Sequence, residues 1–233
     1  IAQRYDTNHH VREVDPDGFD LIDTLASVYD EPFADPSAIP TYRLCQLARQ
    51  QVTVALSGDG GDEMLAGYTR YRYHMAEERL RDMLPFGVRS PIFGALGRIY
   101  LKADWAPRVF RARSTFQSLA MSTTDAYFNT VSLMNDYVRA DLCSSHMLSE
   151  LQSYSAKEVF RSRLGDEAPT EPLALAQYRD VKTYLAGDIL TKVGRASMAH
   201  SLEVRVPLLD HKPVEWMGAS RNHFGCGVRR GSF

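Results

Sequence analysis

The residues best suited to chemistry form one short loop. Ser57-Gly58-Asp59-Gly60-Gly61-Asp62-Glu63 combines three glycines with three carboxylates. Glycine permits positive φ angles and lets backbone N–H groups approach a bound anion closely. Bare carboxylates repel a phosphate unless a divalent cation bridges them, as Mg²⁺ does with one or two carboxylates and phosphate oxygens. The loop therefore favours a Mg–nucleotide or pyrophosphate site with a carboxylate left for proton transfer. An acidic turn that opens a helix is the alternative.

The elements that would position this loop follow an α/β pattern. Residues 52–56 read as a short buried strand because they are apolar and β-branched, and ligands of α/β sheets bind beyond the carboxyl ends of strands. Apolar spacing predicts helices over residues 17–29, 41–50, about 63–84, 173–185 and 188–200. Residues 85–170 read as largely helical, with breaks near Pro85, Pro91, Pro107 and Gly165. Because one strand cannot form a sheet, we expect a mostly helical α/β fold with an incomplete parallel sheet.

Composition narrows the class of protein. The chain has 233 residues, of which 44% are hydrophobic, and its net charge of −2 lacks the basic excess of a nucleic-acid binder. No stretch approaches the roughly 18–20 apolar residues of a membrane helix. Cys45, Cys143 and Cys226 are too far apart for a zinc or disulfide pattern. We expect a reduced, cytoplasmic protein that binds neither nucleic acid nor membrane. Its polar start without methionine indicates a fragment of a longer chain.

Three blocks of sequence resemble the asparagine synthetase family. The run from Val54 to Glu63, continuing to Gly67-Tyr68, is similar to a motif of its ATP-dependent synthetase domain. A second block holds Lys192 and then residues 195–210, and a third is residues 30–37. The blocks lie between about residues 17 and 216, in the family's order and spacing. We therefore interpret residues 1–216 as a partial synthetase domain and residues 217–233 as an atypical tail.

The resemblance implies a fold and a reaction. The fold would be that of an adenine-nucleotide α-hydrolase-like ATP-pyrophosphatase, which is Rossmann-like. The family activates a carboxylate, here with aspartate as first candidate, as an acyl-adenylate, and ammonia from glutamine then displaces AMP. Adenylation is needed because an ionised carboxylate is a poor electrophile. ATP and Mg²⁺ are the implied cofactors, and Mg²⁺, amides and cationic side chains would stabilise phosphate charge.

The resemblance also assigns roles by position. Ser57 and Gly58, with Gly60 and Gly61, would form the nucleotide and acyl-adenylate pocket, and Asp62 would bind Mg²⁺. Asp59 stands where the family often has a glutamate that handles a proton near the reacting carbonyl. Tyr68 would contact the substrate, with packing of the helix as the alternative. Lys192 and Arg195 would contact phosphate oxygens, with a solvated helix face as the alternative.

Two further groups in these blocks are interpreted as structural. Glu203 and Arg205 are expected to pair and organise the turn at Val206-Pro207. Glu31, Asp35 and Ser37 are expected to form a turn rather than to contact the substrate.

The sequence also departs from the family. It lacks the Ser-Gly-Gly-x-Asp-Ser pyrophosphate loop and the glutaminase domain with its N-terminal cysteine, so the isolated chain is expected to be inactive and to depend on that missing domain. Gly194 and Ala186 replace a usual Asp and Pro, and no basic segment follows Trp216. A polysaccharide- or exosortase-associated amidotransferase with another carboxylate substrate, a β-lactam-forming relative and a non-catalytic interaction module remain alternatives. A homodimer is left open.

Overall fold

The chain folds into two compact units. The computed structural model describes residues 2–11, 13–14, 21–99, 113–134, 136–152, 154–165 and 168–220. The first unit takes residues 1–65 and 184–233, and the second takes residues 66–183. Each unit has a hydrophobic cluster of its own.

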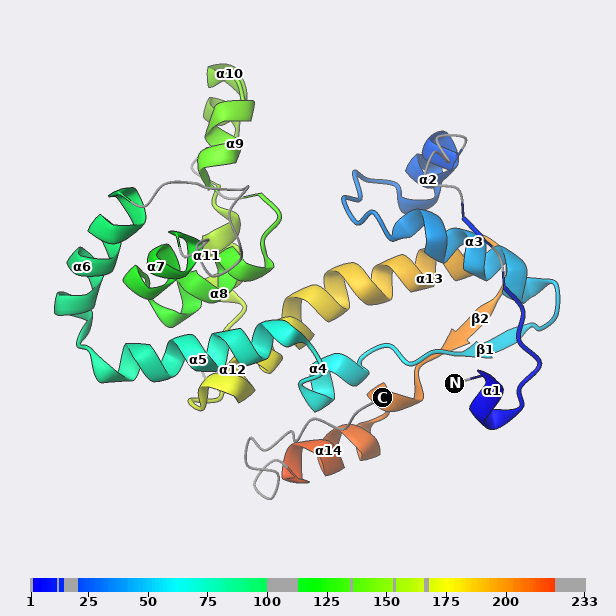
Figure 1. Cartoon of the computed structure of the whole chain (residues 1–233). Coiled ribbons are helices and arrows are strands. Elements are labelled where there is room, and N and C mark those ends of the chain that lie inside the picture. Colours follow the sequence, from blue (N-terminus) through cyan, green and yellow to red (C-terminus); the bar gives the residue numbers. More distant parts are fainter. Residues whose placement is uncertain are drawn as a thin grey trace. The chain divides into compact units, whose positions relative to one another are not determined.

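The first unit contains a parallel pair of strands. β1 (Val54–Leu56) pairs with β2 (Glu203–Arg205), with Ala55 opposite Val204. α3 (Ala38–Arg49) and α13 (Leu190–Met198) lie side by side against the sheet (Figure 1). Their buried side chains Cys45 and Ala196 join Leu202 in the core of this unit. The predicted α/β class with an incomplete parallel sheet is confirmed within the described residues.

The predicted burial of the first strand is wrong. Ala55 packs into the core with α3 and α13, whereas Val54 and Leu56 point to the other face and are 40% and 73% exposed. Side chains alternate between the faces of a strand, and α3 and α13 pack on the face that carries Ala55. Parallel sheets are normally covered on both faces, so the apolar face of β1 is unusual.

Shorter elements complete the first unit. They are α1 (Ala2–Tyr5), α2 (Ile22–Tyr29), α4 (Gly61–Leu65), the 3₁₀ turn η4 (Pro207–Leu209) and α14 (His211–Ser220). The start of the helix predicted over residues 17–29 lies outside the described residues. α14 packs on α4 and on η4, and its Met217 is buried. The rest of the atypical tail, residues 221–233, also lies outside the described part of the chain.

The second unit is helical in its described residues. Its helices are α5 (Thr69–Met83), α6 (Phe86–Ile99), α7 (Arg113–Ala120), α8 (Thr123–Val131), α9 (Asp136–Leu142), α10 (Ser145–Glu150), α11 (Ala156–Ser162) and α12 (Pro172–Asp180). Pro85 and Gly165 lie between helices as predicted, and Pro107 lies outside the described residues.

The break predicted at Pro91 is wrong. Pro91 lies inside α6, where its missing N–H would normally cost about 3 kcal/mol. Packing against α7 offsets this cost, because Phe93 stacks on Phe116 and Arg89 donates to the carbonyl oxygens of Leu119 and Met121. Tertiary contacts thus override the local signal.

The structure divides one predicted helix and joins two others. The helix expected over residues 63–84 is divided into α4 and α5, because Ala66 takes a left-handed φ of 56° and Tyr68 is extended. Conversely, the helices expected over 173–185 and 188–200 are continuous from Pro172 to Met198, with a π-helical segment, η3 (Val181–Ile189), between α12 and α13. Ala186 keeps its N–H, which allows helical structure to continue where a proline would interrupt it.

Candidate functional site

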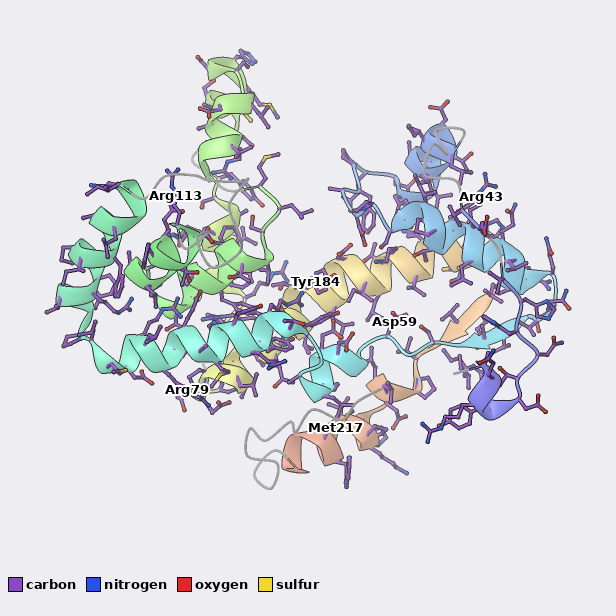
Figure 2. All side chains as sticks on the ribbon, in the orientation of Figure 1. Arg43, Asp59, Arg79, Arg113, Tyr184 and Met217 are labelled. Atoms are coloured by element: carbon purple, nitrogen blue, oxygen red, sulfur yellow. The ribbon has the colours of Figure 1, made fainter. Side chains whose placement is uncertain are left out.

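Ser57 and Asp59 form a hydrogen-bonded turn directly after β1. The Ser57 N–H donates to the carbonyl oxygen of Arg205 at 2.8 Å, which extends the pairing with β2 by one residue. The Ser57 hydroxyl donates to Oδ2 of Asp59 at 2.6 Å, and the Asp59 N–H faces Ser57 Oγ at 3.4 Å. Figure 2 labels Asp59 on the chain between β1 and α4. The turn therefore fixes a half-buried carboxylate at the carboxyl end of a parallel strand.

The glycines of the loop have different environments. Gly60 has a φ of +80°, and a Cβ there would lie 2.2 Å from Cδ2 of Leu209. A Cβ on Gly61 would lie 3.0 Å from Leu208. A Cβ on Gly58 would meet no described atom within 4 Å. Glycine is thus required at position 60 by its φ and its packing against η4, position 61 fits closely against Leu208, and the space around Gly58 is open.

The two carboxylates of α4 differ in their exposure to solvent. Asp62 is exposed on the first turn of the helix, whereas Glu63 is buried with 1% exposure. No group of three His, Cys, Asp or Glu in the described ranges could hold a metal by itself. Mg²⁺ commonly uses one or two protein carboxylates and completes its shell with phosphate oxygens and water. The exposed oxygens of Asp62 fit that kind of site, and the buried Glu63 does not.

Lys192 is held by the segment between α2 and α3. Its Nζ forms an ion pair with Oδ2 of Asp35 and donates to Ser37 Oγ at 2.7 Å. Ser37 in turn donates to Asp35 through its hydroxyl at 2.7 Å and its N–H at 2.8 Å. The Lys192 and Asp35 side chains are 12% and 15% exposed. The solvated-face alternative for Lys192 therefore does not describe this structure, because the ammonium is largely enclosed.

Asp188 and Asp35 have opposite pKa shifts. Burial alone would raise the pKa of Asp35, but hydrogen bonds from Lys192 and Ser37 outweigh burial and hold it below its usual range. Burial and the neighbouring Asp35 charge raise the pKa of Asp188, which lies four residues before Lys192. Two carboxylates close together cannot both ionise freely, so a proton added to the pair goes to Asp188.

Arg195 forms an ion pair that is more exposed than that of Lys192. Its Nη1 lies 2.8 Å from Oδ2 of Asp30, and the two side chains are 48% and 69% exposed. Exposed pairs of this kind contribute about 0–1 kcal/mol. Arg195 is therefore accessible to an anionic ligand at low cost.

A cavity of about 630 Å³ lies beside these residues in the first unit. Its walls are mainly apolar and include Ile22, Leu25, Phe33 and Ile39, while Asp30 and Asp35 supply carboxylates. The cavity thus shares Asp35 with the Lys192 contact and Asp30 with the Arg195 contact.

Tyr68 lies in the second unit. It packs beside Tyr71 with ring centroids 5.8 Å apart, and the Arg70 guanidinium lies 3.8 Å from its ring centroid. It also joins the core cluster around Tyr127. These contacts supply the structural role that was its alternative.

Glu203 and Arg205 pair as the sequence predicts. Arg205 Nε donates to Glu203 Oε1 at 2.7 Å on the exposed side of β2. The next residues, Pro207–Leu209, form the 3₁₀ turn that contacts the glycines of the loop. The motif thus stabilises the loop through packing.

Sequence reasoning missed Asp188 and the enclosure of Lys192. Asp35 is 157 residues from Lys192 in the chain, so no local pattern could pair them. The spacing of Asp188 and Lys192, one helical turn apart, was the available signal.

Comparisons with known proteins identify the family of this chain. The model of the asparagine synthase family matches residues 1–222. Asparagine synthetase (glutamine-hydrolysing) 1 of Bacillus subtilis is 30% identical over 78% of this chain and 27% of its own length. A Mycobacterium bovis protein with the provisional name of glutamine-hydrolysing asparagine synthetase is 30% identical over 98% of this chain and 33% of its own. No solved structure matches significantly.

The chain belongs to the asparagine synthase family, which confirms the resemblance inferred from its sequence. It spans about a third of the length of the curated relatives that it matches. Among the helices in the described part of the chain, none is long and apolar enough to cross a membrane.

Proposed function

We propose that this chain is part of a glutamine-dependent amidotransferase of the asparagine synthetase type. Its reaction joins two steps. A carboxylate oxygen of the acceptor, aspartate in the first instance, attacks the α-phosphorus of ATP and pyrophosphate leaves. Ammonia then attacks the acyl carbon and AMP leaves. Family membership and the relatives' names support this class of reaction.

One observation carries the proposal. The hydrogen-bonded turn of Ser57 and Asp59 lies at the carboxyl end of β1, beside a glycine whose backbone is open. This is where α/β sheets bind ligands, and backbone N–H groups there can receive phosphate oxygens. A carboxylate in the same turn can accept a proton from the attacking ammonia.

The other residues take supporting roles. Asp62 would hold Mg²⁺, which supplies charge neutralisation for the phosphates. Lys192 and Arg195 would contact phosphate oxygens from α13, where a charge-assisted hydrogen bond is strong. Gly60 and Gly61 would shape the loop without touching the ligand.

Replacement of the magnesium ligand tests the proposal in the complete protein. Asp62→Asn is expected to lower ATP-dependent pyrophosphate release by roughly a hundredfold or more, because phosphate charge loses its counter-ion. Asp23→Asn is the matched control, since Asp23 is also an exposed aspartate in the first turn of a helix. Equal, near-normal release from both variants would remove Asp62 from the metal site.

The chain alone gives a second test. It contains no Ser-Gly-Gly-x-Asp-Ser loop, so the 233 residues by themselves are expected to show no ATP–pyrophosphate exchange. Exchange by the isolated chain would mean that the residues described above suffice for adenylation.

The cavity favours a second candidate function. Aspartate has little apolar surface, whereas the 630 Å³ space beside Asp35 has walls of leucine, isoleucine and phenylalanine. An amidotransferase acting on a larger carboxylate with an apolar body would use such a space, and the shorter Asp59 in place of the usual glutamate fits a different acceptor. Pyrophosphate release by the full-length protein with glutamine and a panel of carboxylates separates the candidates. Preference for aspartate would exclude the second.

A further inference from the structure

Two side chains contact the ammonium group of Lys192 in the first unit, and the charge of a third acts on it. Asp35 and Ser37 contact it from the segment between α2 and α3, and Asp188 lies four residues earlier at the end of η3. The Tyr29 hydroxyl also donates to the Lys192 backbone carbonyl oxygen at 3.2 Å. Lys192 is therefore fixed through both its backbone and its side chain.

The hydrogen bonds of Lys192 leave capacity for a ligand. A lysine ammonium has three N–H donors, and Asp35 and Ser37 accept two of them. The Lys192 side chain as a whole retains 12% exposure. A phosphate oxygen could take the third donor while the other two keep their partners.

The charge of the cluster would oppose an anion without a compensating proton. One ammonium and two ionised carboxylates sum to −1, and a phosphate approaching them would be repelled. Burial and Asp35 raise the pKa of Asp188, so a proton taken up by Asp188 together with the phosphate would remove this excess. Tyr29 also lies near Asp35 and Asp188, and burial raises the pKa of its hydroxyl, so it is neutral at pH 7. The cluster can thus become neutral while Asp35 remains paired with Lys192.

We infer that Asp35 is a positioning residue, which with Ser37 and Asp188 directs the Lys192 ammonium toward a phosphate group. The inference rests on the proposed function, because it gives the phosphate contact of Lys192 a physical basis. Asp35 acts through Lys192 and does not touch the ligand. A salt bridge that only joins the segment to α13 is the competing explanation.

Chemical labelling of the 233-residue chain tests the positioning without ATP. A neighbouring carboxylate favours the charged ammonium, which does not acylate. Asp35→Asn is therefore expected to raise the rate of Lys192 acylation by acetic anhydride roughly threefold to tenfold, measured by mass spectrometry. The exposed Lys182 in the same variant serves as the internal control. Asp35→Glu should restore the protection of Lys192 from acylation. If Asp35→Asn unfolds, the milder Ser37→Ala replaces it in the test. Unchanged labelling in both Asp35→Asn and Ser37→Ala would overturn the inference.

A double-mutant cycle in the complete protein tests the functional part. Because a small misplacement can cost up to about a hundredfold in rate, Asp35→Asn is expected to lower kcat/KM for ATP roughly tenfold or more. It should have no further effect in a Lys192→Ala background. Additive losses would mean that Asp35 acts only on the fold. Full activity of Lys192→Ala together with increased labelling in Asp35→Asn would instead reject the phosphate role of Lys192 and leave the side-chain arrangement standing.

Discussion

Candidate site residues of the first unit and the charged core of the second unit differ in exposure. In the first unit, the candidate residues Asp62 and Arg195 are exposed, and Leu56 of β1 is 73% exposed. In the second unit, Glu78, Arg81, Arg179 and Asp180 are all at most 5% exposed. Burying a charge is costly unless it is paired and hydrogen-bonded. The contrast separates charges available to a ligand from charges that specify packing.

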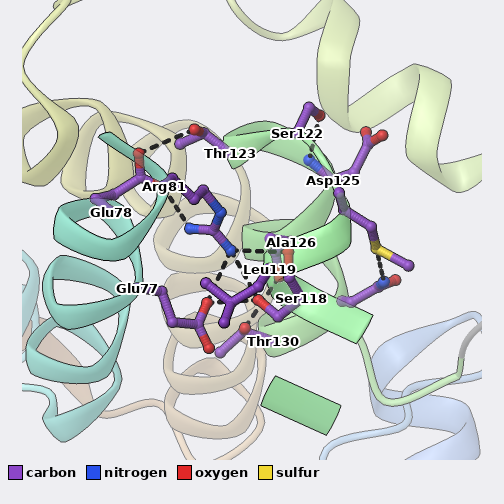
Figure 3. A network of polar contacts seen from close by, with 12 residues as sticks. Glu77, Glu78, Arg81, Ser118, Leu119, Ser122, Thr123, Asp125, Ala126 and Thr130 are labelled. Atoms are coloured by element: carbon purple, nitrogen blue, oxygen red, sulfur yellow. Dashed lines mark hydrogen bonds and ion pairs between the residues drawn. The ribbon is translucent and has the colours of Figure 1, made fainter. Parts of the chain in front are cut away.

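The network around Arg81 illustrates the second kind (Figure 3). Its Nη2 donates to Glu77 at 2.9 Å and to Ser118 at 2.8 Å, and Glu78 pairs with Nη1. Thr123 donates to the other oxygen of Glu78 at 3.0 Å. These contacts join α5 to α7 and to α8. A charge with so many internal partners has a structural role.

Asp180 should give the largest effect on stability. It is fully buried and accepts hydrogen bonds from Tyr71, from Tyr127 at 2.7 Å and from Arg70 at 2.8 Å. Asp180→Asn keeps the shape but removes the charge that balances Arg70, so we expect a loss of about 3–5 kcal/mol. Urea unfolding measures it, with exposed Asp82→Asn as a control expected within about 0.5 kcal/mol. Equal midpoints would show that burial alone does not identify a structural charge.

Gly60 and Gly58 offer a comparison within one loop. Gly60→Ala must adopt a φ of +80° and displace Leu209, so we expect a loss of about 2–4 kcal/mol. Gly58→Ala meets no described atom, and we expect it to leave the urea midpoint nearly unchanged while weakening ATP binding in the complete protein. Leu209→Ala should partly rescue Gly60→Ala. If both glycine variants unfold alike, the loop is structural throughout.

Much of the fold, and less of the site, could be predicted from the sequence. The strand ending at Leu56 and most of α3, a helix predicted over residues 41–50 and found over Ala38–Arg49, follow from local patterns. β2 could not be predicted, since three residues with one apolar side chain give no periodicity. The pairs Lys192–Asp35 and Arg70–Asp180 join residues more than a hundred positions apart, so only tertiary structure reveals them.

Buried His74 predicts a pH dependence of the stability of the second unit. Burial lowers its pKa to about 4, with Arg81 and Arg179 acting in the same direction against Glu78. Between about pH 4 and 6.5 the unfolded chain binds a proton that the folded chain does not, so stability falls as the pH drops through this range. The loss should reach about 2–3 kcal/mol. Unfolding at pH 7 and 4.5 measures it, and the difference should shrink in His74→Gln but persist in the exposed control His146→Gln. An unchanged pH dependence in His74→Gln would assign the effect to other groups.

Replacement of Gly194 should give the smallest effect on stability. It tests whether the helix that carries Lys192 is less stable than it could be. It lies inside α13, where glycine costs about 0.5–1 kcal/mol relative to alanine, and a Cβ there meets no described atom within 4 Å. Gly194→Ala is therefore expected to raise the free energy of unfolding by that amount. Labelling of Lys192 in the same variant shows whether a stiffer helix also holds the ammonium more firmly. Destabilisation by Gly194→Ala would indicate a conformation of α13 that alanine cannot adopt. A gain in stability with unchanged labelling would instead show that Asp35 and Ser37, rather than the helix, determine where Lys192 points.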